Sequence, residues 1–287
     1  MTIATPPGFV AVNEGDGRWL ADATLADDLR RAHLLDADGV RAALARAEGA
    51  EGRARTALVS IGLAQLVLRG VHRGGLLGPL LGDALFGPDR PLREIAVTAA
   101  LRSAGAPVPR PAFGGAFRSH GAGSRGAWRA FVWNGAVATW FEAETRDAEA
   151  WLRAGPSQAS LARALESAGA AVRRFHDAGG SHPDLHLKNL LVRELADRCE
   201  IVVIDLDRAR IVPDLAARQR MAQLMRLYRS LLKRDLLRLV GEPGCTAFFR
   251  AYTRGDDALR DGLLARLPAE RRRVARHALC YWRSESS

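Results

Sequence analysis

The chain has 287 residues, of which 48% are hydrophobic and 26% are charged, a composition that excludes a disordered protein and allows one large core or two smaller ones. The longest uncharged, mainly apolar stretch, residues 56–68, is shorter than the about 20 residues that a membrane-spanning helix requires. The net charge is +10, almost entirely from arginine, which indicates either an anionic partner or an arginine-rich codon bias.

The N-terminus and the cysteines carry information about location. The first residues contain no basic segment followed by an apolar one, so we expect no secretory signal. The three cysteines are far apart and form no CxxC pair, so they predict neither a disulfide framework nor a zinc site. A reducing, cytoplasmic location is therefore expected.

The first half of the chain is predicted to be rich in strands. Residues 1–45 are expected to form an N-terminal extension with a helical stretch near 21–46. A glycine-containing turn and strands follow, and then a helix begins at Asp89, has Pro91 in its first turn and ends at Gly105. The turn and its strands cover residues 49–69, and two further strand-like runs follow the helix, at residues 111–117 and 128–133.

The second half changes to a mostly helical pattern. Helices are expected at 144–152, at 157–176 and through most of the chain after Asp214, with short strands at 190–192 and 200–206. We therefore predict an α+β fold of two lobes, a small antiparallel sheet with one helix over residues 46–134 and a larger helical lobe over 135–287. A cleft between two such lobes is a usual place for a ligand.

The strongest chemical signal is HPDLHLKN at residues 182–189, followed by the apolar run IVVIDLD at residues 201–207. Asp205 ends the apolar run, and a carboxylate there is costly unless it is paired or bound to a cation. Asp184, Asn189 and Asp205 together offer the oxygen ligands and the base that magnesium and a substrate hydroxyl require. The spacing H-x-D-x-x-x-x-N, followed by a strand that ends in I-D, is that of a kinase catalytic loop and its metal-binding aspartate.

This pattern predicts a role for each residue. Asp184 would accept the proton of the attacking hydroxyl, and His182 would support the loop through hydrogen bonds to the backbone. Asn189 and Asp205 would hold Mg²⁺ that bridges the phosphates of ATP. The competing interpretation, capping and turn residues of an ordinary helix–loop–strand, is disfavoured because the asparagine, the apolar strand and its terminal aspartate all occur in register.

The stretch FHDAGGSHPDLHLKN followed by VIDLDRAR resembles the lipopolysaccharide kinase family, and within it the branch that phosphorylates 3-deoxy-D-manno-octulosonic acid (Kdo) of the inner core. Upstream, LVLRGVHRGGLLGPLLGDALFG and PLREIAVTAALRSAGAPVPRP resemble the family's third strand, the connector after it and the helix that carries a glutamate. The resemblance covers residues 49–234 in patches. It implies a protein-kinase-like fold that uses ATP and Mg²⁺.

The resemblance also implies nucleotide-binding residues in the first half. Arg69 stands where kinases usually have a lysine on the α and β phosphates, and Glu94 stands where the helix glutamate pairs with it. An arginine fits here because no lysine precedes Lys188, although its longer, planar group changes the geometry. Gly49 and Gly52 are candidates for the phosphate-covering loop. The competing interpretations are a surface charge for Arg69 and a solvated helix face for Glu94.

The short segment after the metal aspartate bears on the acceptor. Only six residues separate Asp207 from Asp214, and Pro183 replaces the arginine of the usual triplet. A protein substrate needs a longer segment there, so we expect a small-molecule acceptor and no control by a phosphorylated loop.

An anionic glycolipid or sugar is the expected partner, because arginines are abundant at 218–238 and 271–273. These arginines could equally form solvated helix surface, and a location on the cytoplasmic face of the inner membrane is a further option. The sequence contains no nucleic-acid motif and no evident protein partner. Two other classes stay open: a phosphotransferase of the aminoglycoside or choline type, and a nucleotide-binding pseudokinase.

Overall fold

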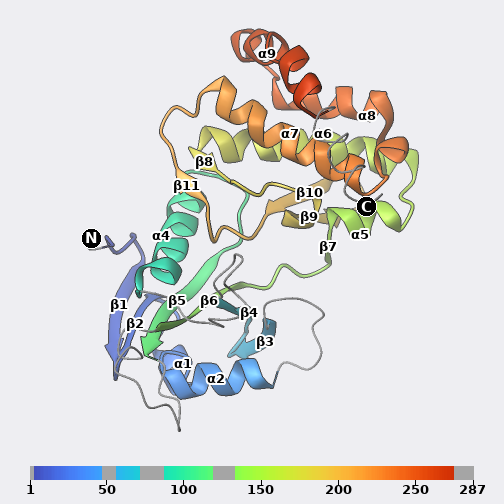
Figure 1. Ribbon diagram of the computed structural model, residues 1–287. Helices are drawn as coiled ribbons and strands as arrows, with labels where there is room; N and C mark the ends of the chain where they lie inside the picture. Colours follow the sequence, from blue (N-terminus) through green and yellow to red (C-terminus); the bar gives the residue numbers. More distant parts are fainter. Residues whose placement is uncertain (1–2, 47–55, 72–86, 119–132, 275–287) are drawn as a thin grey trace, which may run out of the picture. The chain divides into compact units, whose positions relative to one another are not determined.

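The computed structural model describes residues 3–46, 56–71, 87–118 and 133–274 (Figure 1). The chain divides into two compact units. The N-terminal unit comprises Met1–Ser103 and Pro109–Glu142, and the C-terminal unit comprises Ala104–Val108 and Ala143–Ser287.

The N-terminal unit is built on a six-stranded antiparallel sheet in the order β1-β2-β5-β6-β4-β3. Its strands are β1 (Phe9–Glu14), β2 (Gly17–Asp22), β3 (Thr56–Ile61), β4 (Ala64–Val71), β5 (Pro111–Arg118) and β6 (Trp133–Trp140). Its helices are α1 (Ala26–Arg31), α2 (Ala37–Ala45) and α4 (Asp89–Ser103).

The two faces of this sheet bury different cores, as the alternation of side chains along a strand requires. On β2, Trp19 packs into a core that includes Leu29 of α1 and Val40 of α2, whereas the next residue, Leu20, packs into a core that includes Ile95 of α4. The close approach of α4 depends on Gly114 of β5, because a β-carbon there would lie 2.3 Å from Ile95 Cγ1. The sheet is therefore covered by helices on both faces.

The N-terminal residues differ from the extension that the sequence led us to expect. Residues 9–22 form a hairpin, and its second strand pairs with β5 in the register Leu20↔Gly114. Gly15 in the turn has φ +54°, a conformation that glycine adopts without strain. Helix begins only at Ala26, not near residue 21, and the N-terminal unit includes residues that the expected boundary at 45 had separated.

The other predicted strands and the helix of this unit are present, with shifted ends. The helix predicted from Asp89 is α4, and the strand expected at 111–117 is β5. The strand expected at 128–133 instead runs over Trp133–Trp140, while residues 128–132 lie outside the described residues. The main segment of the C-terminal unit begins at Ala143, after the expected boundary at 134, and residues Ala104–Val108 also belong to this unit.

The C-terminal unit is mostly helical. Its helices are α5 (Ala148–Arg153), α6 (Gln158–Asp177), α7 (Ala217–Lys233), α8 (Leu237–Tyr252) and α9 (Asp257–Leu264), with a 3₁₀ turn at Leu187–Asn189. Its strands are β7 (Thr145–Asp147), β8 (Gly180–Ser181), β9 (Leu190–Glu194), β10 (Cys199–Val203) and β11 (Arg210–Ile211), arranged as the sheet β10-β9-β7 and the pair β11-β8.

Helix α6 organises this unit. Its N-cap Ser157 accepts a hydrogen bond from the Ser160 N–H, which satisfies one of the free amides of the first turn. Gly169 lets α8 approach closely, because a β-carbon there would lie 2.2 Å from the Phe248 carbonyl oxygen. The last turn of α6 leads directly into β8 and the loop that carries His182. Across the described ranges of the chain, the helices are too short or too polar to cross a membrane.

Candidate active site

His182 is the first residue of the loop between β8 and β9 and is 2% exposed. Its Nε2 donates a hydrogen bond to the Ile204 carbonyl oxygen at 3.1 Å, and its Nδ1 accepts one from the Asp184 N–H at 3.2 Å. Because a carbonyl can only accept and an amide N–H can only donate, the imidazole is neutral with its proton on Nε2. His182 therefore joins the loop to the end of the β10 strand through hydrogen bonds to the backbone.

Burial is the largest influence on this ring and lowers the pKa of His182 below its usual value of 6.5. Its hydrogen bond to Ile204 opposes that shift. The ring consequently stays neutral near pH 7, and both contacts persist there.

Asn189 connects the same two segments. Its side chain is buried, and its Nδ2 donates to the Asp184 carbonyl oxygen at 2.8 Å. The backbone carbonyl of Asn189 accepts a hydrogen bond from the Ile204 N–H at 3.0 Å. The donor end of the amide is thus directed at the loop backbone. The Oδ1 atom is the end of this side chain that can ligate a cation.

Asp205 follows directly after the residue that both His182 and Asn189 bind. Its backbone has φ +60°, the left-handed region, which costs an ordinary residue about 1–3 kcal/mol. Such strain is concentrated at functional sites. The polypeptide thus turns sharply where the carboxylate leaves the strand.

Asp184 presents its carboxylate outward. Its side chain is 71% exposed, and its Oδ2 lies 3.6 Å from Nε2 of His186. An exposed carboxylate whose backbone is fixed by both His182 and Asn189 is suited to accept a proton from a bound hydroxyl. The structure thus brings together His182, Asp184, Asn189 and the strand end that bears Asp205.

Arg69 and Glu94 meet within the N-terminal unit. Arg69 on β4 forms an ion pair with Glu94 on α4, through its Nη2 and Glu94 Oε1. Glu94 is only 5% exposed, so the interpretation of a solvated helix face is wrong for it. The predicted pair is present, and its role toward a nucleotide stays a prediction. Gly49 and Gly52 lie outside the described residues, as does the HRGG segment at 72–75.

Comparison with known proteins decides the family. Residues 41–252 match the family model described as lipopolysaccharide kinase (Kdo/WaaP) family. The chain belongs to this family. The predicted family is therefore confirmed, and the chain is a kinase.

Two curated relatives of this lipopolysaccharide kinase are described as 3-deoxy-D-manno-octulosonic acid kinases. The one from Vibrio cholerae serotype O1 is 28% identical over 188 residues, which cover 64% of this chain and 72% of the relative. The one from Vibrio parahaemolyticus serotype O3:K6 is 28% identical over 193 residues, which cover 65% and 74%.

A solved structure, described as WaaP in complex with acyl carrier protein, is similar in fold. The TM-score is 0.56 at 22% sequence identity, and the match covers 86% of this chain and 95% of the other. The expected α+β, protein-kinase-like fold is confirmed.

The oxygen donors of this lipopolysaccharide kinase site suit a magnesium ion that is also bound by a nucleotide, rather than a metal ion coordinated by protein side chains alone. In the part of the chain that the structure describes, no three His, Cys, Asp or Glu side chains are grouped to bind a metal ion. Magnesium bound with a nucleotide needs only one or two protein oxygens, because phosphates and water supply the rest. Asn189 Oδ1 and the Asp205 carboxylate are oxygen donors of this kind.

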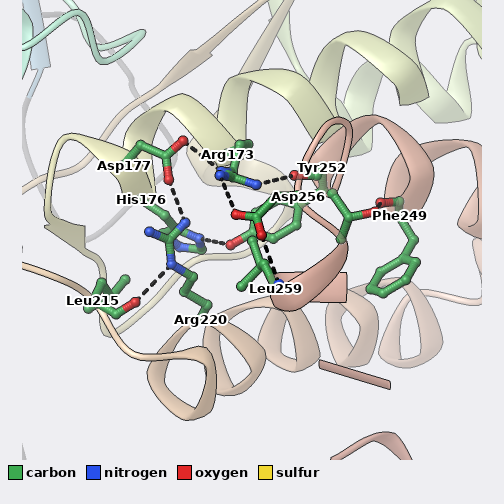
Figure 2. A network of polar contacts seen from close by, with 10 residues as sticks. Arg173, His176, Asp177, Leu215, Arg220, Phe249, Tyr252, Asp256 and Leu259 are labelled. Carbon is green, nitrogen blue, oxygen red and sulfur yellow. Dashed lines mark hydrogen bonds and ion pairs between the residues drawn. The ribbon is translucent and has the colours of Figure 1, made fainter. Parts of the chain in front are cut away.

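A polar network surrounds the end of α6 (Figure 2). Arg173 binds Asp177 and Asp256, and Arg220 binds Asp177 at 2.7 Å. His176 Nδ1 lies 2.7 Å from the Tyr252 hydroxyl. Burial lowers the pKa of His176 to about 3 and raises the pKa of Tyr252 to about 12, so both groups are neutral near pH 7.

The sequence reasoning missed the residues of α7 that contact the loop. Gln223 and Ser230 are buried and accept hydrogen bonds from the His182 and Leu187 N–H groups. A signal was available, because these two polar residues are seven apart on the same helix face as apolar Leu227.

Proposed function

We propose that this lipopolysaccharide kinase transfers the γ-phosphoryl group of ATP to a hydroxyl of Kdo in the inner core or a lipid A precursor. The observation that carries the proposal is the linkage of Asp184, Asn189 and the Asp205 strand end through His182 and Ile204. The names of the two Vibrio relatives support Kdo as the acceptor. A bond forms between the acceptor oxygen and phosphorus, the bond to the β-phosphate breaks, and ADP leaves.

Each residue has a task in this transfer. Asp184 takes the proton from the acceptor hydroxyl, and its exposed carboxylate leaves room for the sugar. Asn189 and Asp205 hold magnesium, which, when bound, neutralises charge on the β and γ phosphates. Arg69 binds phosphate with its planar, permanently charged guanidinium, and Glu94 orients it.

The direct test is mass spectrometry of a Kdo-bearing lipid A precursor after incubation with the protein, ATP and Mg²⁺. We expect a gain of one phosphoryl group that disappears with Asp184→Ala. Asp197→Ala is the matched control, because Asp197 is an exposed aspartate of the same unit on the β9–β10 turn.

The other outcomes separate the alternatives. ATP binding with no mass gain on this acceptor would reject Kdo, and phosphorylation of an aminoglycoside or choline would then identify the other kinase class. Nucleotide binding without turnover of any acceptor would support a pseudokinase.

A second proposal concerns a protein partner, which the sequence did not reveal. The C-terminal unit contains a cavity of about 570 Å³, lined mainly by apolar side chains that include Trp151, Leu224, Met225, Leu231 and Phe248. Cavities of about 300–1,000 Å³ commonly hold small ligands. Because the similar WaaP structure contains acyl carrier protein, we propose that this cavity accepts an acyl chain carried by such a protein.

This second proposal has its own test. Acylated carrier protein should bind at least ten-fold more tightly than the same carrier without its acyl chain. Ala168→Phe, which places a ring in the cavity, should remove that difference. Equal binding of the two carrier forms would reject it.

Membrane attachment is proposed on charge. Arg229 is partly buried beside Arg226 and Arg273. Its pKa is lowered, mainly by burial and to a smaller extent by repulsion from these two arginines. Among the described residues, neither Arg226 nor Arg229 has a carboxylate within ion-pair distance, whereas Arg273 lies 3.9 Å from Glu270. Such a cluster suits an anionic phospholipid surface, where the acceptor would also lie.

A further inference from the structure

Helix α7 carries a stripe of polar residues on its inner face. Arg220, Gln223 and Ser230 are spaced three and seven apart, and Leu227 lies between the last two, so all four share one side of the helix. Gln223 is 2% exposed and Ser230 is 5% exposed. Buried polar side chains on a helix face need partners, and the partners of Gln223 and Ser230 include backbone N–H groups of the candidate site.

Gln223 fixes the first part of the catalytic loop. Its Oε1 accepts a hydrogen bond from the His182 N–H at 2.7 Å, and its Nε2 donates to the Gln219 carbonyl of the preceding turn at 3.4 Å. His182 in turn contacts the Asp184 N–H and the Ile204 carbonyl. One amide on α7 thus determines where His182 can place Asp184 and the strand end before Asp205.

Ser230 fixes the second part of the loop, two helical turns further along. Its Oγ accepts a hydrogen bond from the Leu187 N–H at 3.2 Å and donates one to the Leu227 carbonyl at 2.7 Å. Leu187 begins the 3₁₀ turn that contains Asn189. The hydroxyl thus both accepts and donates a hydrogen bond, and it anchors the turn from which the proposed magnesium ligand projects.

Arg220 fixes the segment that follows the metal aspartate (Figure 2). Its Nε donates to the Leu215 carbonyl at 2.8 Å, and its Nη1 binds Asp177 at 2.7 Å. The same segment is paired through β11 with β8, and the Val212 N–H donates to the Gly179 carbonyl at 2.8 Å. The segment is therefore held at both ends by contacts that need no phosphorylation.

We infer that Gln223 and Ser230 are positioning residues for phosphoryl transfer, and that α7 rather than the loop itself sets the placement of Asp184 and Asn189. This inference rests on the proposed function for its catalytic readout. Neither side chain need touch a substrate. Each acts by giving a loop N–H its acceptor, so losing it should displace the proton acceptor or the magnesium ligand.

The experiment compares three variants with a matched control. Gln223→Met keeps the volume and removes the acceptor, Gln223→Glu keeps the acceptor, and Ser230→Ala removes the hydroxyl. Gln219→Met makes the same chemical change one turn earlier, where the side chain is exposed and accepts a hydrogen bond from the Ala216 N–H.

A positioning role predicts a specific kinetic result. With ATP, Mg²⁺ and the Kdo-bearing precursor, kcat should fall about 100-fold for Gln223→Met and about ten-fold or more for Ser230→Ala, the range expected from misplacing a reacting group by about 1 Å. The KM for ATP should stay within about three-fold. Gln223→Glu should recover most of kcat, and Gln219→Met should match the wild type.

Amide hydrogen exchange supplies a readout that does not depend on turnover. The His182 amide should exchange faster in Gln223→Met, and the Leu187 amide should exchange faster in Ser230→Ala, with both unchanged in Gln219→Met. If the wild type is active and Gln223→Met keeps wild-type kcat, the inference is overturned. If the wild type transfers no phosphoryl group, the proposed function fails instead. In that case, unchanged exchange of the His182 amide in Gln223→Met and of the Leu187 amide in Ser230→Ala would overturn the inference.

Discussion

Asp205 combines a proposed magnesium-binding side chain with an unfavourable backbone conformation. A residue with a β-carbon at φ +60° is less stable than glycine by about 1–2 kcal/mol, because the β-carbon crowds the following carbonyl. We expect Asp205→Gly to be more stable than Asp205→Ala by about 1 kcal/mol, while both lose phosphoryl transfer. Denaturant unfolding of the two variants measures this difference.

A second aspartate provides the control for this prediction. Asp214 has φ +52°, is exposed and lies outside the proposed site. Asp214→Gly should likewise be more stable than Asp214→Ala, but both should keep wild-type activity. Equal stability of Asp205→Gly and Asp205→Ala would show that the turn at Asp205 stores no strain.

At the scale of elements, strand β4 and helix α4 are joined by an ion pair in which Glu94 is buried and Arg69 is partly exposed. Removing one partner of such a pair costs about 3–5 kcal/mol, because the other charge stays buried. Arg69→Met should therefore destabilise the protein strongly, since Glu94 is 5% exposed. The double variant Arg69→Met, Glu94→Gln should recover most of that stability but not the activity.

Thermal unfolding and enzyme kinetics together separate a role of Arg69 in stability from a role in phosphoryl transfer. Thermal unfolding should show the double variant near the wild type, while the KM for ATP rises or kcat falls by at least ten-fold in both variants. Full activity of the stable double variant would mean that Arg69 serves only the packing of α4 on β4.

The end of helix α6 predicts an acid-sensitive stability. His176 has a pKa of about 3 in the folded protein and about 6.5 when unfolded. Between these values the unfolded chain binds the extra proton, so the free energy of unfolding rises with pH and falls as the solution is acidified below about 6.5. The slope from this group is at most about 1.4 kcal/mol per pH unit.

Replacing the ring tests this dependence. His176→Phe should flatten the decline of unfolding free energy between pH 6.5 and acid conditions, which urea titrations at several pH values can measure. His33→Phe is the control, because His33 is exposed on the turn after α1. An unchanged slope in His176→Phe would assign the acid sensitivity to other groups.

The sequence predicted some elements better than others for physical reasons. The grouping of the candidate site was predictable because His182, Asp184 and Asn189 lie within eight residues and Asp205 ends a distinct apolar run, whereas the catalytic role of these residues stays a prediction. The β1–β2 hairpin was missed because its partner, β5, is about a hundred residues away in the chain, and only that pairing reveals it as part of the sheet. The polar stripe of α7 was missed because Gln223 and Ser230 gain meaning only from the loop amides that they bind.

At the scale of the whole molecule, the net charge of +10 becomes informative through its distribution. On α1 and α2, Arg30, Arg31 and Arg41 each pair with a neighbouring aspartate. In the C-terminal unit, Arg226 and Arg273 instead lie close enough to Arg229 to repel its charge, although Arg273 also lies 3.9 Å from Glu270. Binding to an anionic surface would relieve that repulsion. Arginines that already pair with an aspartate would add little to the binding.

This difference gives a prediction with an internal control. Co-sedimentation with vesicles that contain anionic phospholipid should be strong at about 0.05 M salt and weak at about 0.5 M, because added ions screen exposed charges. The triple change of Arg226, Arg229 and Arg273 to Gln should lower the bound fraction at least five-fold. The triple change of Arg30, Arg31 and Arg41 to Gln removes the same charge and should bind nearly as well as the wild type. If both triple variants lose binding equally, attraction to the membrane would depend on net charge alone and the cluster would have no special part in it.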